Sequence, residues 1–336
     1  MSRTLARRGV LLSVAAGLTF TLAACGGDAD ASAPAATSGT NQVEIAVATG
    51  DPYTETTIDV PVQADIRAKL PKDVLDSGKL VIGEGALPAG FPPLAFTGTD
   101  AKTITGSEPD LGRLVAAVLG LEPEINNSTW ENLFVGIDSG RNDIGFSNIT
   151  VTEERKQKYD FASYRNDDLA FQVKKDSTWN FDENYENLAG LVVSVGKGTN
   201  QEKILLEWQE KLKAAGKPFE VKYFADNNAV QLALASGKID AYFGPNPGIQ
   251  YQIARGASGS TPTRNAGSWS GAGDTLQGLI AATTKKGSGL AEPVAEAIDY
   301  LIENGQYEAW LKAYQLENEA VEQSEVNPAG LPLDNE

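Results

Sequence analysis

The sequence predicts an α/β fold built from two similar lobes, and three features of the chain lead to this prediction. Short apolar runs typical of buried strands alternate with amphipathic helices, which is the pattern of an α/β protein. Residues 139–146 and 236–243 share Ser, Gly, Asp and Phe at identical spacing. Each half also opens with a strand that runs into glycine, over residues 78–85 and 190–198. Internal similarity of this kind indicates two like lobes, each with a small sheet.

The start of the chain resembles an export signal that ends at a lipid-attachment site. Three arginines precede an apolar run from Val10 to Leu22, which is too short to span a bilayer but suits a secretory signal. The run ends in Leu-Ala-Ala-Cys, as in the bacterial lipobox, and Cys25 is the only cysteine of the chain. We therefore expect a signal peptide at residues 1–24 and a protein on the extracytoplasmic face of the bacterial cell membrane, attached only through lipidated Cys25.

Composition removes several classes of function. The chain has no histidine, so it cannot use a histidine base or build a zinc site from histidine and cysteine. The formal net charge is −17, and an acidic surface of this kind repels nucleic acid. Carboxylate sites for calcium or magnesium stay open, although no acidic loop has EF-hand spacing. We expect a monomer that is not an enzyme, with no cofactor, no metal and no nucleic-acid partner.

The two ends of the chain differ in composition from its middle. Residues 26–41 are mostly small or polar, and residues 25–72 are expected to be a lipidated cysteine and a mostly flexible tether. Within this range, residues 43–57 show a short apolar alternation whose structure stays open. A helix over Ala64–Asp76 is expected to lead into the first lobe. Residues 317–336 are expected to form an acidic tail.

Periodicity places the elements of the first half. Leu80–Ile82 is predicted to be a buried strand, and Ile144–Phe146 another. Between them, apolar residues at i, i+3, i+4, i+7 and i+8 predict a helix with a proline in its first turn and a glycine after its end. A second helix is expected to begin after Ser128 or Thr129, either of which can cap it. The apolar positions of the first helix are Leu111, Leu114, Val115, Val118 and Leu119.

Short polar, glycine-rich loops follow the predicted strands of both halves. In open α/β sheets, ligands bind outside the carboxyl ends of the strands. Two like lobes that face each other would place these loops around one cleft, with backbone N–H groups available to an anion. The loops are residues 84–85, 147–150, 196–200 and 244–247.

Several segments between residues 73 and 315 resemble, in the same order, the family-3 extracellular solute-binding proteins. The most specific is the Thr-x-Thr-Glu-Glu-Arg motif at residues 150–155, with Asp143 upstream. Members of this family serve ABC importers of polar amino acids, opines and related compounds. The other matching segments are Gly78–Gly83, Pro92–Phe96, Gly106–Leu111, Trp130–Gly140, Tyr159–Ala162, Lys197–Thr199 and Glu303–Tyr307.

The resemblance implies a periplasmic-binding-protein-like fold, in which a hinge of two crossing strands joins two α/β lobes. On this sequence it implies a first lobe of residues 73–168 plus 279–316 and a second lobe of residues 169–278. Such proteins close by hinge motion, because the ligand touches both lobes only in the closed state. The implied function is capture of an amino acid or amino-acid-like zwitterion and its delivery to an ABC importer permease.

The resemblance also implies residues that hold the ligand's carboxylate. Arg155 offers a planar fork that can bind a carboxylate, and Thr150 is expected to add its hydroxyl or N–H. The N–H of Asn148 or Ser147 is expected to assist. Thr199 stands where a glycine-rich turn enters a helix, which favours an anion. The alternatives are a surface arginine and a plain helix cap.

Other expected site residues face the rest of the ligand. Trp130 has the family's aromatic-wall position, and Phe91 competes with Phe96 for the opposite wall. Glu84 stands where the family often has an acidic residue, which is expected to meet the ammonium group or the side chain of the ligand. Asn246 follows a proline at the position where the family commonly has an aspartate for the α-ammonium. This departure leaves open a standard α-amino acid, a quaternary amine, a cyclic zwitterion, a peptide-like compound or an opine.

Two other functions stay open at this point. One is a lipoprotein that senses a solute and reports to a partner. The other is a dehydratase-like enzyme on the same fold, for which Glu84 or Lys197 would supply the acid or base.

Overall fold

The computed structural model describes residues 39–48 and 53–334, in which strands and helices alternate. The strands are β1 (Thr40–Val47), β2 (Thr54–Pro61), β3 (Lys79–Glu84), β4 (Phe96–Thr97), β5 (Ile104–Thr105), β6 (Glu122–Asn127), β7 (Ile144–Gly145), β8 (Tyr159–Asn166), β9 (Asp168–Lys174), β10 (Val192–Ser194), β11 (Glu220–Lys222), β12 (Ala241–Pro245), β13 (Thr263–Ser270) and β14 (Leu279–Lys285). The helices are α1 (Ala64–Arg67), α2 (Lys72–Ser77), α3 (Ser107–Val118), α4 (Trp130–Asp138), α5 (Asn200–Ala214), α6 (Asn227–Ala235), α7 (Asn246–Gly256), α8 (Ala291–Glu303) and α9 (Gln306–Tyr314), with 3₁₀ turns η1 (Arg155–Gln157), η2 (Tyr185–Leu188) and η3 (Glu317–Glu319).

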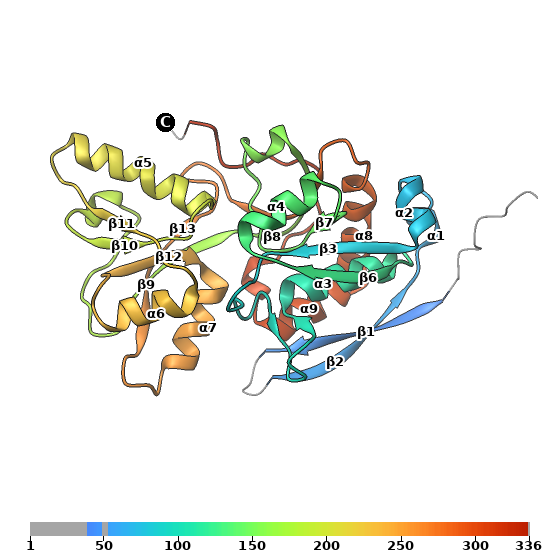
Figure 1. The fold of residues 1–336 in the computed structure, drawn as a ribbon, viewed down its shortest axis with the longest axis horizontal. Helices are drawn as coiled ribbons and strands as arrows, with labels where there is room; N and C mark the ends of the chain where they lie inside the picture. The colour runs from blue at the N-terminus through green and yellow to red at the C-terminus, as the bar shows by residue number, and fades with distance from the viewer. Residues whose placement is uncertain (1–38, 49–52, 335–336) are drawn as a thin grey trace, which may run out of the picture. The chain divides into compact units, whose positions relative to one another are not determined.

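Two sheets of the same design organise these elements (Figure 1). The first has the order β6-β3-β7-β14-β8 and the second the order β11-β10-β12-β9-β13. In each, three neighbouring parallel strands are followed by two strands joined antiparallel. The first sheet with the elements packed on it is called the first lobe, and the second sheet with its helices the second lobe. The predicted two-lobed α/β fold is confirmed.

The repeat found in the sequence has a physical counterpart in both lobes. Asp143 precedes β7, donates its N–H to the Val81 carbonyl at 2.9 Å, and accepts the Val81 N–H on its carboxylate at 2.8 Å. Asp240 precedes β12 and makes the same pair of bonds to Val192, both at 2.8 Å. The shared aspartate therefore joins β3 to β7 in the first lobe and β10 to β12 in the second.

Helices cover both faces of each sheet. In the first lobe, α3, α8 and α9 bury one apolar cluster together with the β1–β2 hairpin, while α4 packs on the other face. In the second lobe, α5 packs on one face, and α6 and α7 pack on the other. The chain passes between the lobes at Asp167, between β8 and β9, and again through residues 271–278, between β13 and β14.

The elements predicted for the first half are present. Leu80–Ile82 lies within β3, and Ile144 begins β7. The five predicted apolar positions of the helix are buried in α3, with Leu119 as its C-cap. Thr129 caps α4, because its hydroxyl accepts the N–H of Asn132 at 3.4 Å.

The single helix predicted over Ala64–Asp76 is wrong. The structure has two short helices there, α1 and α2, and Pro71 stands between them as the N-cap of α2. Proline has no N–H for a helical hydrogen bond and disfavours a helical conformation in Leu70 before it. The first helix therefore ends before Pro71, and the second begins after it.

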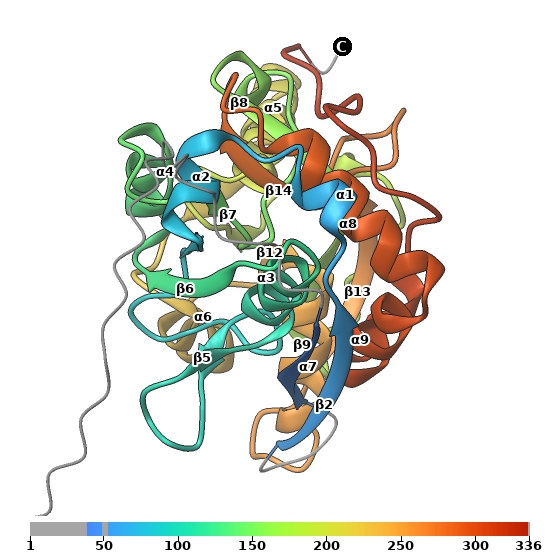
Figure 2. The same cartoon turned by 90° about the vertical axis from the view of Figure 1, so that its right-hand side faces the viewer.

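The prediction of a mostly flexible tether over residues 25–72 does not hold for residues 40–47 and 54–72. β1 and β2 form an antiparallel hairpin with Thr40 opposite Pro61. Its apolar residues alternate and enter the first-lobe core beside α3 and α9, as Figure 2 shows for β2 and α9. Packing against α9, more than 200 positions later in the chain, is not visible in the local sequence. The buried hairpin residues are Val43, Ile45, Ala46, Ile58 and Val60.

We predict that Ile45→Ala lowers the free energy of unfolding by about 2–4 kcal/mol, because Ile45 is only 1% exposed and the change leaves a cavity. Urea unfolding measures the effect. Glu44→Ala, at the exposed neighbouring position, is the control and is expected to stay within about 0.5 kcal/mol of the wild type. Equal stability of the two variants would contradict the packing of the hairpin.

The predicted signal peptide and Cys25 lie outside the described residues. Within residues 39–48 and 53–334, none of the helices is both long and apolar enough to span a bilayer.

The expected acidic tail is bound to both lobes. Figure 1 shows this segment in dark red, passing from the first lobe toward α5. The N–H of Asn327 donates to the Phe161 carbonyl at 2.9 Å in the first lobe. The Leu331 side chain is buried in the apolar cluster of the second lobe. Lys203, in α5, donates to the carbonyls of Pro332 and Leu333 at 2.9 and 2.8 Å.

Candidate functional site

A cleft between the two lobes is the candidate site. It encloses about 340 Å³, near the lower end of the range of about 300–1,000 Å³ for small-molecule sites. Its lining includes the loops that follow β3, β7 and β10 and the carboxyl end of β12, at the carboxyl ends of parallel strands. The sequence predicts four loops around one cleft; the first three contribute to it, but of residues 244–247 only Gly244 and Pro245 line it, while Asn246 and Pro247 begin α7.

Aromatic side chains from both lobes line the cleft. The Phe91 ring lies so close to Gly248, in α7, that a β-carbon on Gly248 would come within 2.4 Å of it. The Trp130 indole N–H donates to the Gly198 carbonyl of the second lobe at 3.2 Å. Phe91 and Trp130 therefore lie in the cleft, as the sequence predicts, and each also contacts the opposite lobe. The aromatic lining residues are Phe91, Trp130, Phe224, Tyr242 and Phe243.

The cleft is more acidic than basic. Among the described residues that line the cleft, Lys197 carries a positive charge, and a larger number of residues have carboxylate groups. Within the described part of the chain, no group of three His, Cys, Asp or Glu side chains is placed to hold a metal ion. The charged lining residues are Glu108, Glu131, Lys197 and Asp226.

Glu84 lies beneath the cleft rather than in its lining. It ends β3, next to the lining residue Gly85, and its side chain is fully buried. Among the described residues, neither carboxylate oxygen of Glu84 has a hydrogen-bond partner. Burial raises the pKa of this carboxyl well above its usual range, and the nearby charge of Glu108 raises it further. Glu84 therefore holds its proton more tightly than an exposed glutamate does.

Asn148 lines the cleft and is held by a buried network. Its φ is +52°, in the left-handed region, and its N–H donates to Glu108 Oε2 at 2.5 Å. Its Oδ1 accepts a hydrogen bond from Arg165 Nη2 at 2.5 Å. The same Nη2 also donates to Glu108 Oε1 at 3.1 Å. Asn148 is thus at the predicted site, but Arg165 and Glu108 fix its orientation.

Thr150, whose hydroxyl or N–H is predicted to bind a carboxylate of the ligand, uses its hydroxyl on a carboxylate of the protein. Its buried hydroxyl donates to Asp167 Oδ2 at 2.7 Å. The same oxygen accepts a bond from Asn200 Nδ2, at the start of α5, at 3.1 Å. Asp167 therefore links the first lobe to the second at the point where the chain crosses between them.

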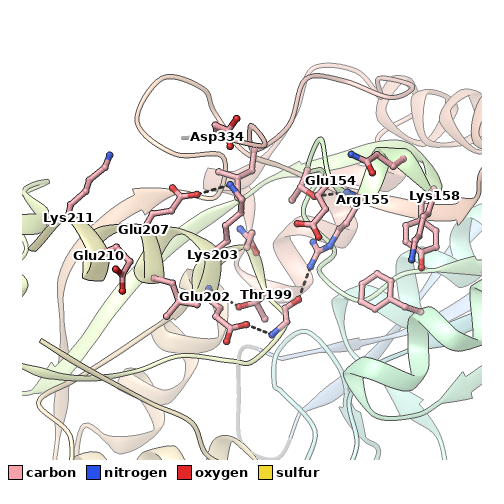
Figure 3. A pocket seen from close by; sticks show the side chains of 18 residues that line it. Glu154, Arg155, Lys158, Thr199, Glu202, Lys203, Glu207, Glu210, Lys211 and Asp334 are labelled. Atoms are coloured by element: carbon pink, nitrogen blue, oxygen red, sulfur yellow. Dashed lines mark hydrogen bonds and ion pairs between the residues drawn. The ribbon is translucent and has the colours of Figure 1, made fainter. Parts of the chain in front are cut away.

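Arg155 also lies outside the cleft. Its guanidinium donates to the carbonyls of Thr150 at 2.9 Å and Gly198 at 3.3 Å, and lies 5.5 Å from the centre of the Trp130 ring. Arg155 lines a second cavity of about 990 Å³ with α5 and the C-terminal segment (Figure 3). Desolvation lowers the pKa of Arg155 to about 10, so it stays charged at neutral pH. In this arrangement the guanidinium packs against Trp130, which lines the cleft.

The remaining two predicted residues differ in position. Thr199 lines both cavities and caps α5: its hydroxyl donates to the Gly196 carbonyl at 2.7 Å and accepts the N–H of Glu202 at 3.1 Å. Asn246 begins α7, accepts a bond from Gln250 at 3.0 Å, and lines a different cavity beside the C-terminal segment. The structure therefore does not bring Asn246 into the cleft.

Three residues that bear on the cleft were not among the predicted ligand-binding residues. Glu108 lies in the Gly106–Leu111 segment, whose motif could have identified it. Asn200 begins α5, directly after the predicted Thr199. Tyr242 lies inside the internal repeat, and no local pattern distinguishes it from a core residue.

We predict that Asp167 makes stability depend on pH. Burial raises the pKa of its carboxyl from 3.8 to about 6, although the bonds from Thr150 and Asn200 oppose this shift. The folded protein then holds this proton more tightly than the unfolded chain. The contribution to stability is complete below about pH 4 and is lost as the pH rises through about 6.

Asp167→Asn is therefore expected to remove a loss of stability that the wild type shows between about pH 4 and pH 6. Urea unfolding at several pH values measures it. Asp176→Asn, at an exposed position in the second lobe, is the control and should keep the wild-type profile. Identical profiles for wild type and Asp167→Asn would contradict the prediction.

The fold is similar to that of known solute-binding proteins. Residues 86–317 match the profile of the bacterial extracellular solute-binding proteins, family 3. The chain belongs to this family. Its resemblance to the family, predicted from the sequence motifs, is therefore confirmed, and the family description places its members outside the cell.

Individual family-3 relatives are binding proteins of different specificity. The L-cystine-binding protein TcyJ of Escherichia coli K12 is 32% identical over 169 residues, which cover 50% of this chain and 59% of that protein. The arginine-binding protein ArgT of Corynebacterium glutamicum is 27% identical over 266 residues, covering 78% of this chain and 83% of that protein. The structure of an ancestral arginine-binding protein bound to arginine has a TM-score of 0.60 and 26% identity, over 70% of this chain and 98% of that one.

Proposed function

We propose that this chain is a solute-binding lipoprotein that captures an amino acid or amino-acid-like zwitterion between its lobes and delivers it to an ABC importer permease. The observation that carries the proposal is the cleft, which is lined by loops from both lobes and has groups suited to both charges of a zwitterion. The binding functions of the relatives support the class of solute.

The two charges of the solute have different partners in the proposed complex. Its cationic group approaches the first lobe, where Glu108 lines the cleft and Glu84 lies beneath it. Its carboxylate approaches the start of α5, where Asn200 and Gln201 line the cleft beside Lys197. The N-terminus of a helix favours an anion because its first N–H groups have no intrahelical partner.

Closure of the lobes completes the site. Phe91, in the loop after β3, and Trp130, at the start of α4, both contact the second lobe, so both walls meet the solute only when the lobes are together. A solute that touches both lobes favours this closed arrangement over an open one. The carboxylate clamp of Arg155 and Thr150 is not part of this proposal, because protein groups already occupy both side chains.

Calorimetric titration of the mature chain tests the proposal. The compounds are L-arginine, L-cystine, L-histidine and L-glutamine, together with a betaine, ectoine and an opine. One-to-one binding of at least one zwitterion is expected. Binding of none of these, with binding of a dicarboxylate or a sugar, would overturn the proposed solute class. Turnover of a bound compound would favour the dehydratase-like enzyme instead.

We predict that Cys25→Ser releases the protein from the membrane. The sequence motif at Cys25 supports lipidation of that thiol, and a lipid chain with the tether would then be the attachment. In a bacterial host, wild type is expected in the membrane fraction and the variant in the soluble fraction, as measured by immunoblotting. A variant that stays membrane-bound would contradict lipid anchoring through Cys25.

A further inference from the structure

The C-terminal segment reaches the cleft through a buried ion pair. The family match ends at residue 317, so almost all of this segment lies beyond it. Glu319, in η3, is fully buried, and its carboxylate forms an ion pair with the guanidinium of Arg165. Arg165 is only 1% exposed, so both charges are removed from water. A buried ion pair of this kind is sensitive to the loss of either partner.

Arg165 connects that ion pair to the lining of the cleft. Its Nη1 faces Glu319, while its Nη2 donates to Asn148 Oδ1 and Glu108 Oε1. Asn148 is in a left-handed conformation, which costs energy in a residue other than glycine and needs support from its surroundings. With Oδ1 held by Arg165, the Nδ2 group is the part of this amide left to donate.

The charge of Arg165 is shared between two carboxylates. Glu108 and Glu319 both form ion pairs with it. If Glu319 were neutral, only Glu108 would attract the Arg165 guanidinium as a charged partner. The guanidinium would then move toward Glu108. The Nη2 group could then no longer hold both Glu108 and Asn148 in the same geometry. A change in the C-terminal segment is thereby transmitted to a residue of the cleft.

We propose that Glu319 is a positioning residue of the binding site, which holds Arg165 so that Asn148 presents its amide to the solute. The C-terminal segment is then part of the binding machinery and not only a contact with both lobes. This inference rests on the proposed function, in that the cleft is taken as the solute site.

Nuclear magnetic resonance tests the positioning without any solute. In the mature chain, Glu319→Gln removes the charge at constant size, and Glu319→Asp keeps the charge on a shorter side chain. Glu325→Gln is the matched control, because Glu325 lies in the same segment with an exposed side chain. We expect the backbone and side-chain amide resonances of Asn148 to shift in Glu319→Gln, to shift less in Glu319→Asp, and to stay in place in Glu325→Gln. Unchanged Asn148 resonances in a folded Glu319→Gln variant would overturn the proposal.

A double-mutant cycle then measures the effect on binding, with L-arginine and L-cystine as the probes. Glu319→Gln is expected to weaken binding about tenfold, and Asn148→Ala is expected to weaken it as well, with coupling between the two sites. The double variant should bind no more weakly than Asn148→Ala alone. Additive losses would show that Glu319 does not act through Asn148. A wild-type chain that binds neither probe would count against the proposed function, and the resonances of Asn148 would still decide the positioning.

Discussion

Trp130→Ala is expected to weaken solute binding by about 30-fold or more, which is the loss typical of a buried aromatic contact at the centre of an interface. Trp130 lines the cleft, donates to the Gly198 carbonyl of the second lobe, and lies against the Arg155 guanidinium. Its removal takes away a wall of the cleft and a bond between the lobes. Calorimetric titration measures the loss.

Trp130→Phe separates these two contributions. It keeps an aromatic wall but loses the indole N–H, so a loss of about 2- to 10-fold is expected, in line with one neutral hydrogen bond. Trp179→Phe, at a tryptophan of the second lobe outside the cleft lining, is the control and should leave affinity unchanged. Wild-type affinity in Trp130→Ala would place the solute elsewhere.

Solute binding is also expected to release a proton from Glu84 at pH values between the pKa of the bound form and that of the free form. In the empty protein, burial and Glu108 raise the pKa of Glu84, and neither carboxylate oxygen has a partner among the described residues. A cationic group beside it favours the ionised form and lowers the pKa. Affinity should therefore rise with pH, by up to about tenfold per pH unit, between the pKa of the bound form and that of the free form.

Titration in buffers with different heats of ionisation measures the released proton. Glu84→Gln is expected to abolish the release and weaken binding, because glutamine cannot supply a negative charge. Glu131→Gln, at an exposed glutamate in the cleft lining, is the matched control and should still release the proton. Equal proton release from wild type and Glu84→Gln would show that the solute's cation does not meet Glu84.

The sequence predicts the fold well because its signals are local. The shared Ser-Gly-Asp-Phe segments place Asp143 and Asp240 in the same two-bond bridge, and the ends of four parallel strands meet at one cleft. Hydrophobic periodicity and capping residues need only a few neighbouring positions. The β1–β2 hairpin was missed because its partners, α3 and α9, lie far along the chain.

The candidate site was predicted only in part because side-chain direction depends on distant partners. Thr150 and Arg155 stand at the positions that the motif indicates, but Asp167 takes the hydroxyl of one, and backbone carbonyls take the guanidinium of the other. Asp167 belongs to the crossing between the lobes, which no local pattern relates to the motif. Asn246 is the first residue of α7, directly after Pro245. With other residues of that helix it lines another cavity, beside the C-terminal segment.

A crystal structure of the protein with the tightest-binding zwitterion from the titration tests the central claim most directly. We predict that the solute lies in the cleft between the lobes, with its cationic group beside Glu84 and Glu108 and its carboxylate at the start of α5. A solute found in the larger cavity, with its carboxylate on the Arg155 guanidinium, would contradict this account.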